Sequence, residues 1–130
     1  MENRIICLDT SVLIDFYRKK EKSKSLFFKL TKKYMFFAVS AVTEYEFHIG
    51  NSQEQNMFWD DFFSRVVVLS FDTKVVKHAV RIYKQLKQLN KLIDIPDIMI
   101  AGTALQNNMP LATLNRKHFE RIDGLTIITE

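Results

Sequence analysis

Short, unbroken runs of apolar residues constrain the fold of this chain more than any other feature. The first run, residues 4–8, contains Ile5-Ile6-Cys7-Leu8 and stops at Asp9. Contiguous rather than alternating apolar residues are typical of a strand that is covered on both faces, as in a parallel sheet. Similar runs stand at residues 35–39, 65–70, 110–114 and 125–129. These runs predict five short strands.

Segments in which apolar residues recur at helical spacing separate these runs. We expect helices within residues 9–17, 23–33, 40–49, 53–64, 72–90, 94–107 and 116–120. Strands that alternate with helices form a parallel sheet with helices on both faces. The sequence therefore predicts an α/β fold, a three-layer α/β/α domain with a mostly parallel sheet of about five strands. Its length suits one domain, which we expect to span residues 1–130.

The composition narrows the classes of function. The net charge of +4 is a mild bias toward polyanions. The single cysteine, Cys7, excludes a disulfide within the chain and reads as a core residue rather than a nucleophile. One cysteine and three scattered histidines exclude a zinc site of the usual spacing. No signal peptide and no stretch of ~20 apolar residues is evident, so we expect a cytoplasmic protein without a membrane partner.

Acidic residues gather where predicted strands turn into helices, which is where sites form in open α/β sheets. Asp9 ends the first run, Glu44 and Glu46 follow the second, and Asp97 opens a later helix. Clustered carboxylates repel one another and favour a bound cation. Their oxygens suit Mg²⁺ or Mn²⁺. Two such ions ~4 Å apart can activate water and stabilise the leaving oxygen of a phosphodiester.

Each acid also has a purely structural explanation. Asp9 could cap the helix that follows it, and Asp97 could be a first-turn acid favoured by the helix dipole. Glu46 could lie on a solvated helix face, and Asp94 is better explained as an N-cap alone. Glu44 stands two residues from Glu46, so only one of the two can face a common site.

Four segments, in order along the chain, resemble the motifs of PIN-domain ribonucleases. They are residues 6–15, 40–47, 97–105 and 111–119. The first is an apolar strand ending in Asp-Thr-Ser, and the second places Ser and Thr before a ligand Glu. The third is an Asp followed by apolar and small residues, and the fourth reads Thr-x-Asn-x-x-His-Phe. The resemblance spans nearly the whole chain and is closest to the VapC-like toxins of bacterial toxin–antitoxin pairs.

This resemblance implies a Mg²⁺- or Mn²⁺-dependent endoribonuclease that is the toxin of a type II toxin–antitoxin system. It implies that Asp9, Glu46 and Asp97 bind the metal and act in catalysis together with Asn115. It also implies an RNA substrate, a cognate antitoxin encoded beside the toxin, and a homodimer. The spacing from Thr43 assigns the second-motif role to Glu46.

The fourth motif departs from the family pattern. Members often carry Asp at the position of Asn115 or His118, and this chain has neither carboxylate. Asn115 can still hydrogen-bond to water near the metal, whereas His118 is more readily explained as structural or exposed. Ser11 and Thr113 are expected either to orient the ligands or merely to cap helices. The departure weakens the case for a second metal ion.

Two other functions compete with the nuclease. A non-catalytic PIN scaffold that binds RNA or a protein stays open, because the fourth acid is missing. An aspartyl-phosphate phosphatase of the haloacid-dehalogenase kind also has an Asp after its first strand. It needs a second Asp two residues on, where this chain has Ser11. The sequence does not reveal which RNA a nuclease of this kind would cut.

Two surfaces are candidates for partner contact. Arg116 and Lys117 stand beside the fourth motif and are the best candidates for contacts with RNA phosphates. The helix at residues 53–64 carries four large aromatic side chains around most of its circumference. These are Phe58, Trp59, Phe62 and Phe63. They either pack in the core or contact an antitoxin or a second subunit.

Overall fold

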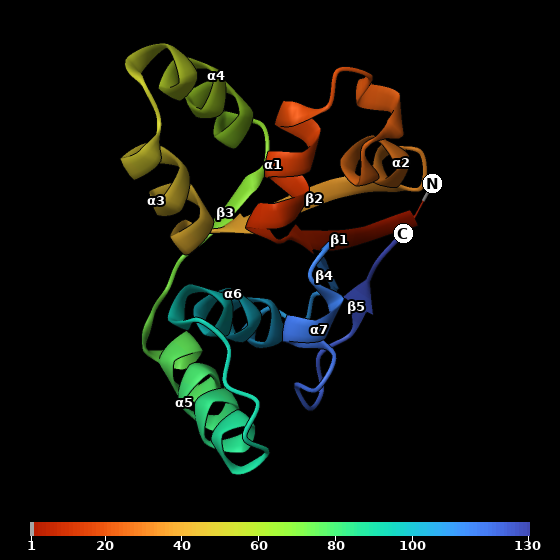
Figure 1. The fold of residues 1–130 in the computed structure, drawn as a ribbon. Helices are drawn as coiled ribbons and strands as arrows, with labels where there is room; N and C mark the ends of the chain where they lie inside the picture. Colours follow the sequence, from red (N-terminus) through yellow and green to blue (C-terminus); the bar gives the residue numbers. More distant parts are fainter. Residues whose placement is uncertain (1) are drawn as a thin grey trace.

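The computed structural model describes residues 2–130 and shows a parallel sheet between two layers of helices (Figure 1). The strands are β1 (Glu2–Leu8), β2 (Tyr34–Ser40), β3 (Val67–Leu69), β4 (Leu111–Ala112) and β5 (Ile127–Ile128). The helices are α1 (Thr10–Arg18), α2 (Leu26–Thr31), α3 (Ala41–Gly50), α4 (Gln53–Ser64), α5 (Thr73–Gln88), α6 (Ile95–Gln106) and α7 (Arg116–Phe119), with a 3₁₀ turn at Lys22–Lys24. The predicted three-layer fold and element order are confirmed. Within the described part of the chain, no helix is long and apolar enough to cross a membrane.

The order of strands across the sheet creates a natural place for a site. The order is β3-β2-β1-β4-β5, and every neighbouring pair is parallel. The chain moves outward from β1 to β2 and β3, and then returns to place β4 on the other side of β1. Ligand sites in such sheets form at the carboxyl ends of the two strands where the direction of winding reverses. Those strands are β1 and β4.

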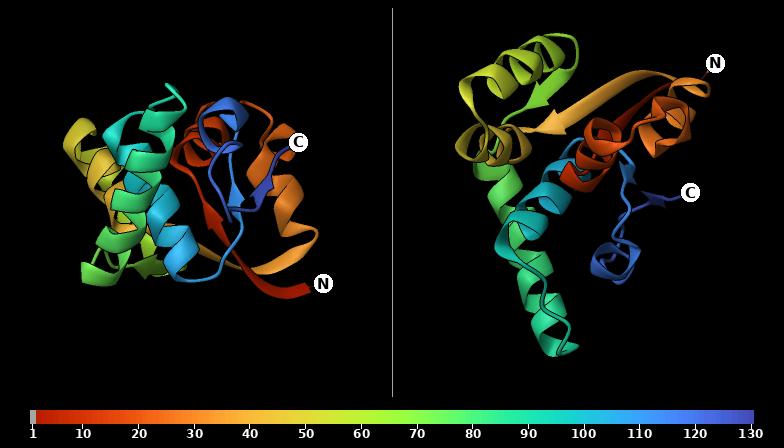
Figure 2. Two further views of the ribbon diagram at one scale, coloured as in Figure 1. Left: turned by 90° about the horizontal axis from the view of Figure 1, so that it is seen from below. Right: turned by 45° about the horizontal axis from the view of Figure 1, so that its top comes forward.

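Strand β1 is covered on both faces, as its contiguous apolar run predicts. Ile6 and Leu8 pack with α1, α2 and α4 on one side, and Cys7 packs with α5, α6 and α7 on the other. Figures 1 and 2 show these two layers, with α5 and α6 side by side beneath the sheet. Burial, with a smaller contribution from the charge of Asp9, raises the pKa of the Cys7 thiol to about 12. The cysteine is therefore a core residue and not a nucleophile.

Several elements are shorter than predicted, for local reasons. The predicted helix at residues 23–33 is divided, because the Ser25 hydroxyl accepts a hydrogen bond from the Phe28 amide and starts α2 there. The predicted strand at residues 110–114 is regular only at Leu111–Ala112, because the Thr113 hydroxyl accepts a hydrogen bond from the Asn115 backbone amide and turns the chain there. The outer strands predicted at 65–70 and 125–129 likewise pair only in their central residues. These differences leave the connections between elements unchanged.

The aromatic side chains of α4 serve mainly the core. Trp59 is fully buried and Phe63 nearly so, which supports the packing explanation for these two residues. Phe58 and Met57 remain exposed on the same helix. The ring of Phe58 lies 5.3 Å from that of Tyr17 in α1. An aromatic surface therefore remains where α1 and α4 meet.

Candidate active site

Asp9 lies directly after β1, at the switch point of the sheet, and is only 1% exposed. Its Oδ2 accepts hydrogen bonds from the hydroxyls of Ser11, at 2.7 Å, and Thr113, at 2.8 Å. Its Oδ1 is buried and has no hydrogen-bond partner among the described residues. Asp9 occupies the N-cap position of α1, but its side chain makes no capping hydrogen bond. Helix capping therefore does not explain this buried carboxylate.

The hydroxyls of Thr113 and Ser11 reach Asp9 from two different elements, β4 beside it and α1 after it. The Asp9 amide donates to the Ala112 carbonyl at 2.9 Å, so Thr113 emerges from β4 beside it. Ser11 stands in the first turn of α1, and its hydroxyl also accepts a hydrogen bond from the Leu114 amide. Ser11 and Thr113 thus orient Asp9, which was one of the two expectations for them. One oxygen of Asp9 is fixed and the other is left without a partner.

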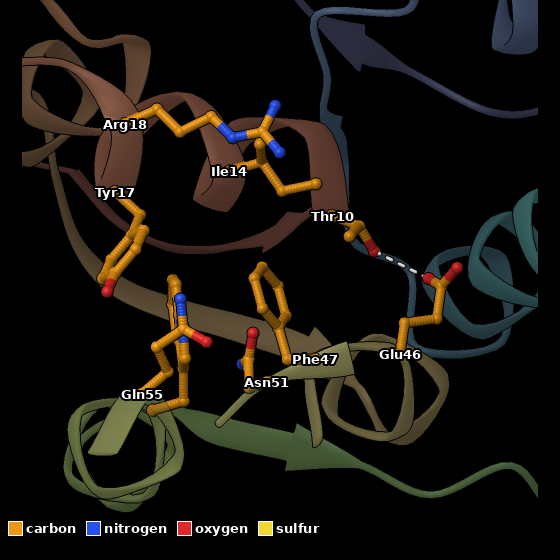
Figure 3. A pocket seen from close by; sticks show the side chains of 9 residues that line it. Thr10, Ile14, Tyr17, Arg18, Glu46, Phe47, Asn51 and Gln55 are labelled. Carbon is orange, nitrogen blue, oxygen red and sulfur yellow. Dashed lines mark hydrogen bonds between the residues drawn. The ribbon is translucent and has the colours of Figure 1, made fainter. Parts of the chain in front are cut away.

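Glu46 reaches the same end of the sheet from α3. Ser40, the last residue of β2, accepts a hydrogen bond from the Val42 amide and starts this helix directly at the strand end. The Thr10 hydroxyl donates to Oε1 of Glu46 at 3.0 Å (Figure 3). The Thr43 hydroxyl lies 3.0 Å from that of Thr10. This contact places Glu46, the glutamate to which the spacing assigns the second-motif role, at this end of the sheet.

Asp97 lies in the first turn of α6 and is held from α7. Nδ1 of His118 is 2.7 Å from Oδ2 of Asp97. Asp94 occupies the N-cap position of α6 as predicted, but its side chain makes no capping hydrogen bond. Asn115 is placed differently from the three acids. Its side chain is exposed, and its backbone N–H donates to the Thr113 hydroxyl at 2.9 Å.

Electrostatic interaction connects the three carboxylates. Burial raises the pKa of Glu46; the charges of Asp97 and Asp9 raise it further, while the hydrogen bond from Thr10 lowers it. Burial also raises the pKa of Asp97; its contact with His118 opposes this, and the charges of Asp9 and Asp94 add to it. The three acids, which come from distant parts of the sequence, therefore lie within one another's electrostatic reach.

The donor set fits a hard divalent cation. Among the residues that the structure describes, no three His, Cys, Asp or Glu side chains are grouped closely enough to hold an ion as they stand. The partnerless Oδ1 of Asp9 nevertheless carries a desolvation cost that a cation would offset. A cation would also remove the repulsion that raises the pKa values of Glu46 and Asp97. Carboxylate oxygens are the ligands that Mg²⁺ and Mn²⁺ prefer.

Two residues of this network were missed by sequence reasoning. Thr10 enters the sequence analysis only as part of the first motif, yet it holds Glu46. His118 was explained as structural or exposed, yet it holds Asp97. The only signals in the sequence were that Thr10 adjoins Asp9 and that His118 lies in the fourth motif. Neither signal identifies the carboxylate that each residue contacts.

Comparison with known proteins identifies the class to which this fold and site belong. The PIN domain family matches residues 6–125. The chain is 36% identical over 122 residues to ribonuclease VapC1 of Methanocaldococcus jannaschii, covering 93% of this chain and 83% of the relative. It is 31% identical over 123 residues to the tRNA(fMet)-specific endonuclease VapC of Shigella flexneri, covering 91% and 92% of the two chains.

Solved structures agree with this assignment. The DNA-bound VapBC structure from Salmonella typhimurium superimposes with a TM-score of 0.83 at 27% identity, covering 98% of both chains. The DNA-bound VapBC2 structure from Rickettsia felis, at 23% identity, shares the fold with a TM-score of 0.82. The chain belongs to the PIN-domain family and, within it, to the VapC ribonucleases. Nucleases of this family depend on a metal ion.

Proposed function

We propose that this protein is the endoribonuclease toxin of a type II toxin–antitoxin system and that Asp9, Glu46 and Asp97 bind Mg²⁺ or Mn²⁺. One observation carries the site assignment. The buried Oδ1 of Asp9 lacks a partner, and the charge of Asp9 acts on both other carboxylates. A cation at this point would coordinate the oxygen that lacks a partner and would also reduce the repulsion among the three carboxylates. The family and its relatives, named as ribonucleases and an endonuclease, support RNA as the substrate.

The bound ion would activate water and neutralise charge on the scissile phosphodiester. The protein contributes the orientation of the ligands. Hydroxyls of Ser11 and Thr113 fix one oxygen of Asp9, the Thr10 hydroxyl fixes one oxygen of Glu46, and His118 fixes one oxygen of Asp97. In each carboxylate the second oxygen is left for the ion. Ligands held by such partners bind metals more tightly than freely rotating ones.

Asn115 is proposed as the fourth catalytic residue, at the rim of the site. Its side chain lines a hollow with Ser11, Arg18 and Leu114. An amide there can donate to a phosphate oxygen and accept from water. It would orient the reacting groups without contributing a charge to the metal.

Basic side chains next to the site are proposed to bind the RNA backbone. Arg116 pairs with Glu120 at 3.1 Å across an exposed helical turn. Exposed pairs of this kind are worth at most about 1 kcal/mol, so phosphate can replace the glutamate. Lys117 is exposed beside it. Both would add affinity and salt dependence rather than sequence choice.

The proposed partners are a cognate antitoxin and a second copy of the chain. Structural relatives are described as VapBC complexes and toxin–antitoxin complexes, which supports an antitoxin. An apolar hollow between α3 and α6, lined by Val42, Tyr45, Ile49 and Met99, supports a subunit contact. Tyr45 and Ile49 are about two-thirds exposed there, at 64% and 65%. We propose that the protein acts as a single domain in the cytoplasm, where RNA is available.

Cleavage of total bacterial RNA by purified protein that is free of antitoxin tests this function. We expect cleavage with Mg²⁺ or Mn²⁺, and none with EDTA or with the Asp9→Ala variant. Asp123→Ala, which changes an exposed acid outside the four motifs, serves as the matched control. If folded wild-type protein left all RNA intact under these conditions, the nuclease assignment would be wrong and a non-catalytic scaffold would be favoured.

A further inference from the structure

A cavity opens beside the carboxylate site, between α1, α3 and α4. It has a volume of about 340 Å³, and Thr10 and Glu46 line one end of it. Figure 3 shows Tyr17, Asn51 and Gln55 around the same space, away from the Thr10–Glu46 hydrogen bond. A volume near the lower end of the range for small-ligand sites is too large for one or two water molecules. Because Thr10 and Glu46 belong to both, the cavity is an extension of the proposed metal site and not a separate site.

Three polar side chains of this cavity, those of Asn51, Gln55 and Arg18, are free to donate hydrogen bonds. The side-chain nitrogen of Asn51 is buried and has no partner among the described residues. Gln55 is fixed by a capping box, in which its Oε1 accepts from the Ser52 amide at 2.8 Å. This leaves its side-chain amide nitrogen available. Arg18, in the last turn of α1, makes no ion pair within the described part of the chain and adds a third donor.

Part of the cavity wall is aromatic and rigid. The ring of Tyr17 lies 5.5 Å from Trp59 and 5.3 Å from Phe58. Trp59 is in turn 4.1 Å from Phe47 and fully buried. Tyr17 itself is 38% exposed, so part of its ring is accessible from outside. Fixed aromatic rings beside hydrogen-bonding side chains are the means by which proteins hold unstacked bases of single-stranded RNA.

We infer that this cavity binds one RNA nucleobase next to the phosphodiester that is cut, and that it selects the base. The inference rests on the proposed nuclease function and deepens it. A flat, neutral base can stack on Tyr17 while its edge meets the free donors of Asn51, Gln55 and Arg18. An acidic peptide side chain in the same place would lie against the carboxylate of Glu46. The surplus of donors favours guanine, with the acceptors O6 and N7, and uracil, with the acceptor O4, over adenine and cytosine, which carry a donating amino group in place of that oxygen.

Cleavage of a randomised single-stranded RNA library, with the cut sites sequenced, measures this selection. We expect the wild type to prefer guanine or uracil about tenfold at one position beside the cut. Tyr17→Leu and Asn51→Ala should each largely abolish that preference, and Tyr17→Phe should keep it. Tyr83→Leu removes a similarly exposed tyrosine from α5 and should change nothing. An unchanged base preference in both Tyr17→Leu and Asn51→Ala would overturn the inference. Variants that lost antitoxin binding but kept the base preference would overturn it as well.

Photocrosslinking separates this inference from the proposed function. Oligonucleotides carrying 5-iodouridine at successive positions are irradiated with the protein in EDTA, so no cleavage is needed. A crosslink to Tyr17 from one position of the oligonucleotide supports a base in the cavity, even if the wild type proves inactive. Crosslinks confined to other elements, such as α5, would refute it even if the protein cleaves RNA.

Discussion

Nδ1 of His118 lies 2.7 Å from Oδ2 of Asp97, so a side chain of α7 holds a carboxylate of α6. The Asp97 side chain is only 19% exposed, and burial raises its pKa. The contact with His118 favours the charged form and opposes that shift. His118 occupies a position where the family often has an acid. We conclude that it positions Asp97 instead of adding a further carboxylate.

Replacing His118 should therefore weaken metal binding before it affects the fold. We expect His118→Phe to lower Mn²⁺ affinity about 10- to 100-fold, because Asp97 loses the group that orients it. His118→Asn keeps a donor near the position of Nδ1 and should lose less. Titration calorimetry without RNA measures both. His78→Phe is the control, since His78 hydrogen-bonds Gln106 on the α5 side of the molecule. Equal affinities of wild type and His118→Phe would rule out this positioning role.

The carboxylates should make the stabilising effect of metal grow with pH. The pKa values of Glu46 and Asp97 are raised by burial in the folded protein, so the folded state binds more protons than the unfolded chain. Their contribution to the free energy of unfolding is therefore present below the usual carboxyl range of about 4 and is lost as pH rises above it. A bound cation replaces those protons.

Thermal unfolding in EDTA and in Mg²⁺, from pH 4.5 to 7.5, checks this pH dependence. The increase in Tm caused by Mg²⁺ should become larger across the series. In Asp97→Asn, which removes one of the two shifted groups, the increase should be smaller and should depend less on pH. A Mg²⁺ effect that is constant or declines with rising pH would contradict the proposed coupling.

Neutralising Asp9 should stabilise the metal-free protein while destroying its metal site. Asp9→Asn keeps an oxygen for the hydroxyls of Ser11 and Thr113. It removes a buried charge that raises the pKa values of Glu46 and Asp97. We expect the free energy of unfolding in EDTA to rise by about 0.5–2 kcal/mol, a gain often seen when functional strain is removed.

Urea denaturation in EDTA, with calorimetric titration of Mn²⁺, measures both effects of Asp9→Asn. The control Asp72→Asn replaces the N-cap of α5, and Asn caps helices about as well as Asp. Its stability should stay near that of the wild type. A less stable Asp9→Asn protein, or one that still binds Mn²⁺, would show that Asp9 serves the fold rather than the metal.

Local sequence patterns were sufficient to predict the fold. The apolar run of β1 and the helical spacing after it depend on neighbouring residues, and Ser40 and Ser52 mark helix starts by chemistry that can be read directly. The end of β4 was less predictable, because Thr113 is oriented there by a contact with Asp9, 104 residues away in sequence. The start of α2 depends on a local cap by Ser25, which the sequence analysis missed.

The sequence predicted the three acids of the candidate site but not the side chains that hold them. Strand ends indicated Asp9, Glu46 and Asp97 because a parallel sheet brings its carboxyl ends to one edge. Thr10 stands 36 residues from the glutamate that it holds, and His118 stands 21 residues from Asp97. No local pattern encodes such pairings. Asn115 was predicted as catalytic from its motif, and its exposed side chain leaves that role as a prediction.

The close packing of α5 against α6 gives a further prediction, because α6 carries Asp97. A Cβ added at Gly102 would lie 3.2 Å from the Ala79 amide nitrogen and 3.4 Å from the Val75 carbonyl oxygen. These are backbone atoms, so one helix must shift by a few tenths of an ångström to make room for the methyl group. We expect Gly102→Ala to lower the free energy of unfolding by about 1–3 kcal/mol, as overpacked cores do.

Gly50→Ala is the matched control for Gly102→Ala, since a Cβ at the end of α3 meets nothing within 4 Å. It should leave stability unchanged or raise it by up to about 1 kcal/mol, because alanine restricts the unfolded chain. Urea denaturation of both variants measures the difference, and Mn²⁺ titration of Gly102→Ala shows whether the shift of α6 reaches Asp97. Equal stability of the two alanine variants would mean that α5 and α6 can separate without cost. In that case a glycine at position 102 would not be required to keep α6, and with it Asp97, in place.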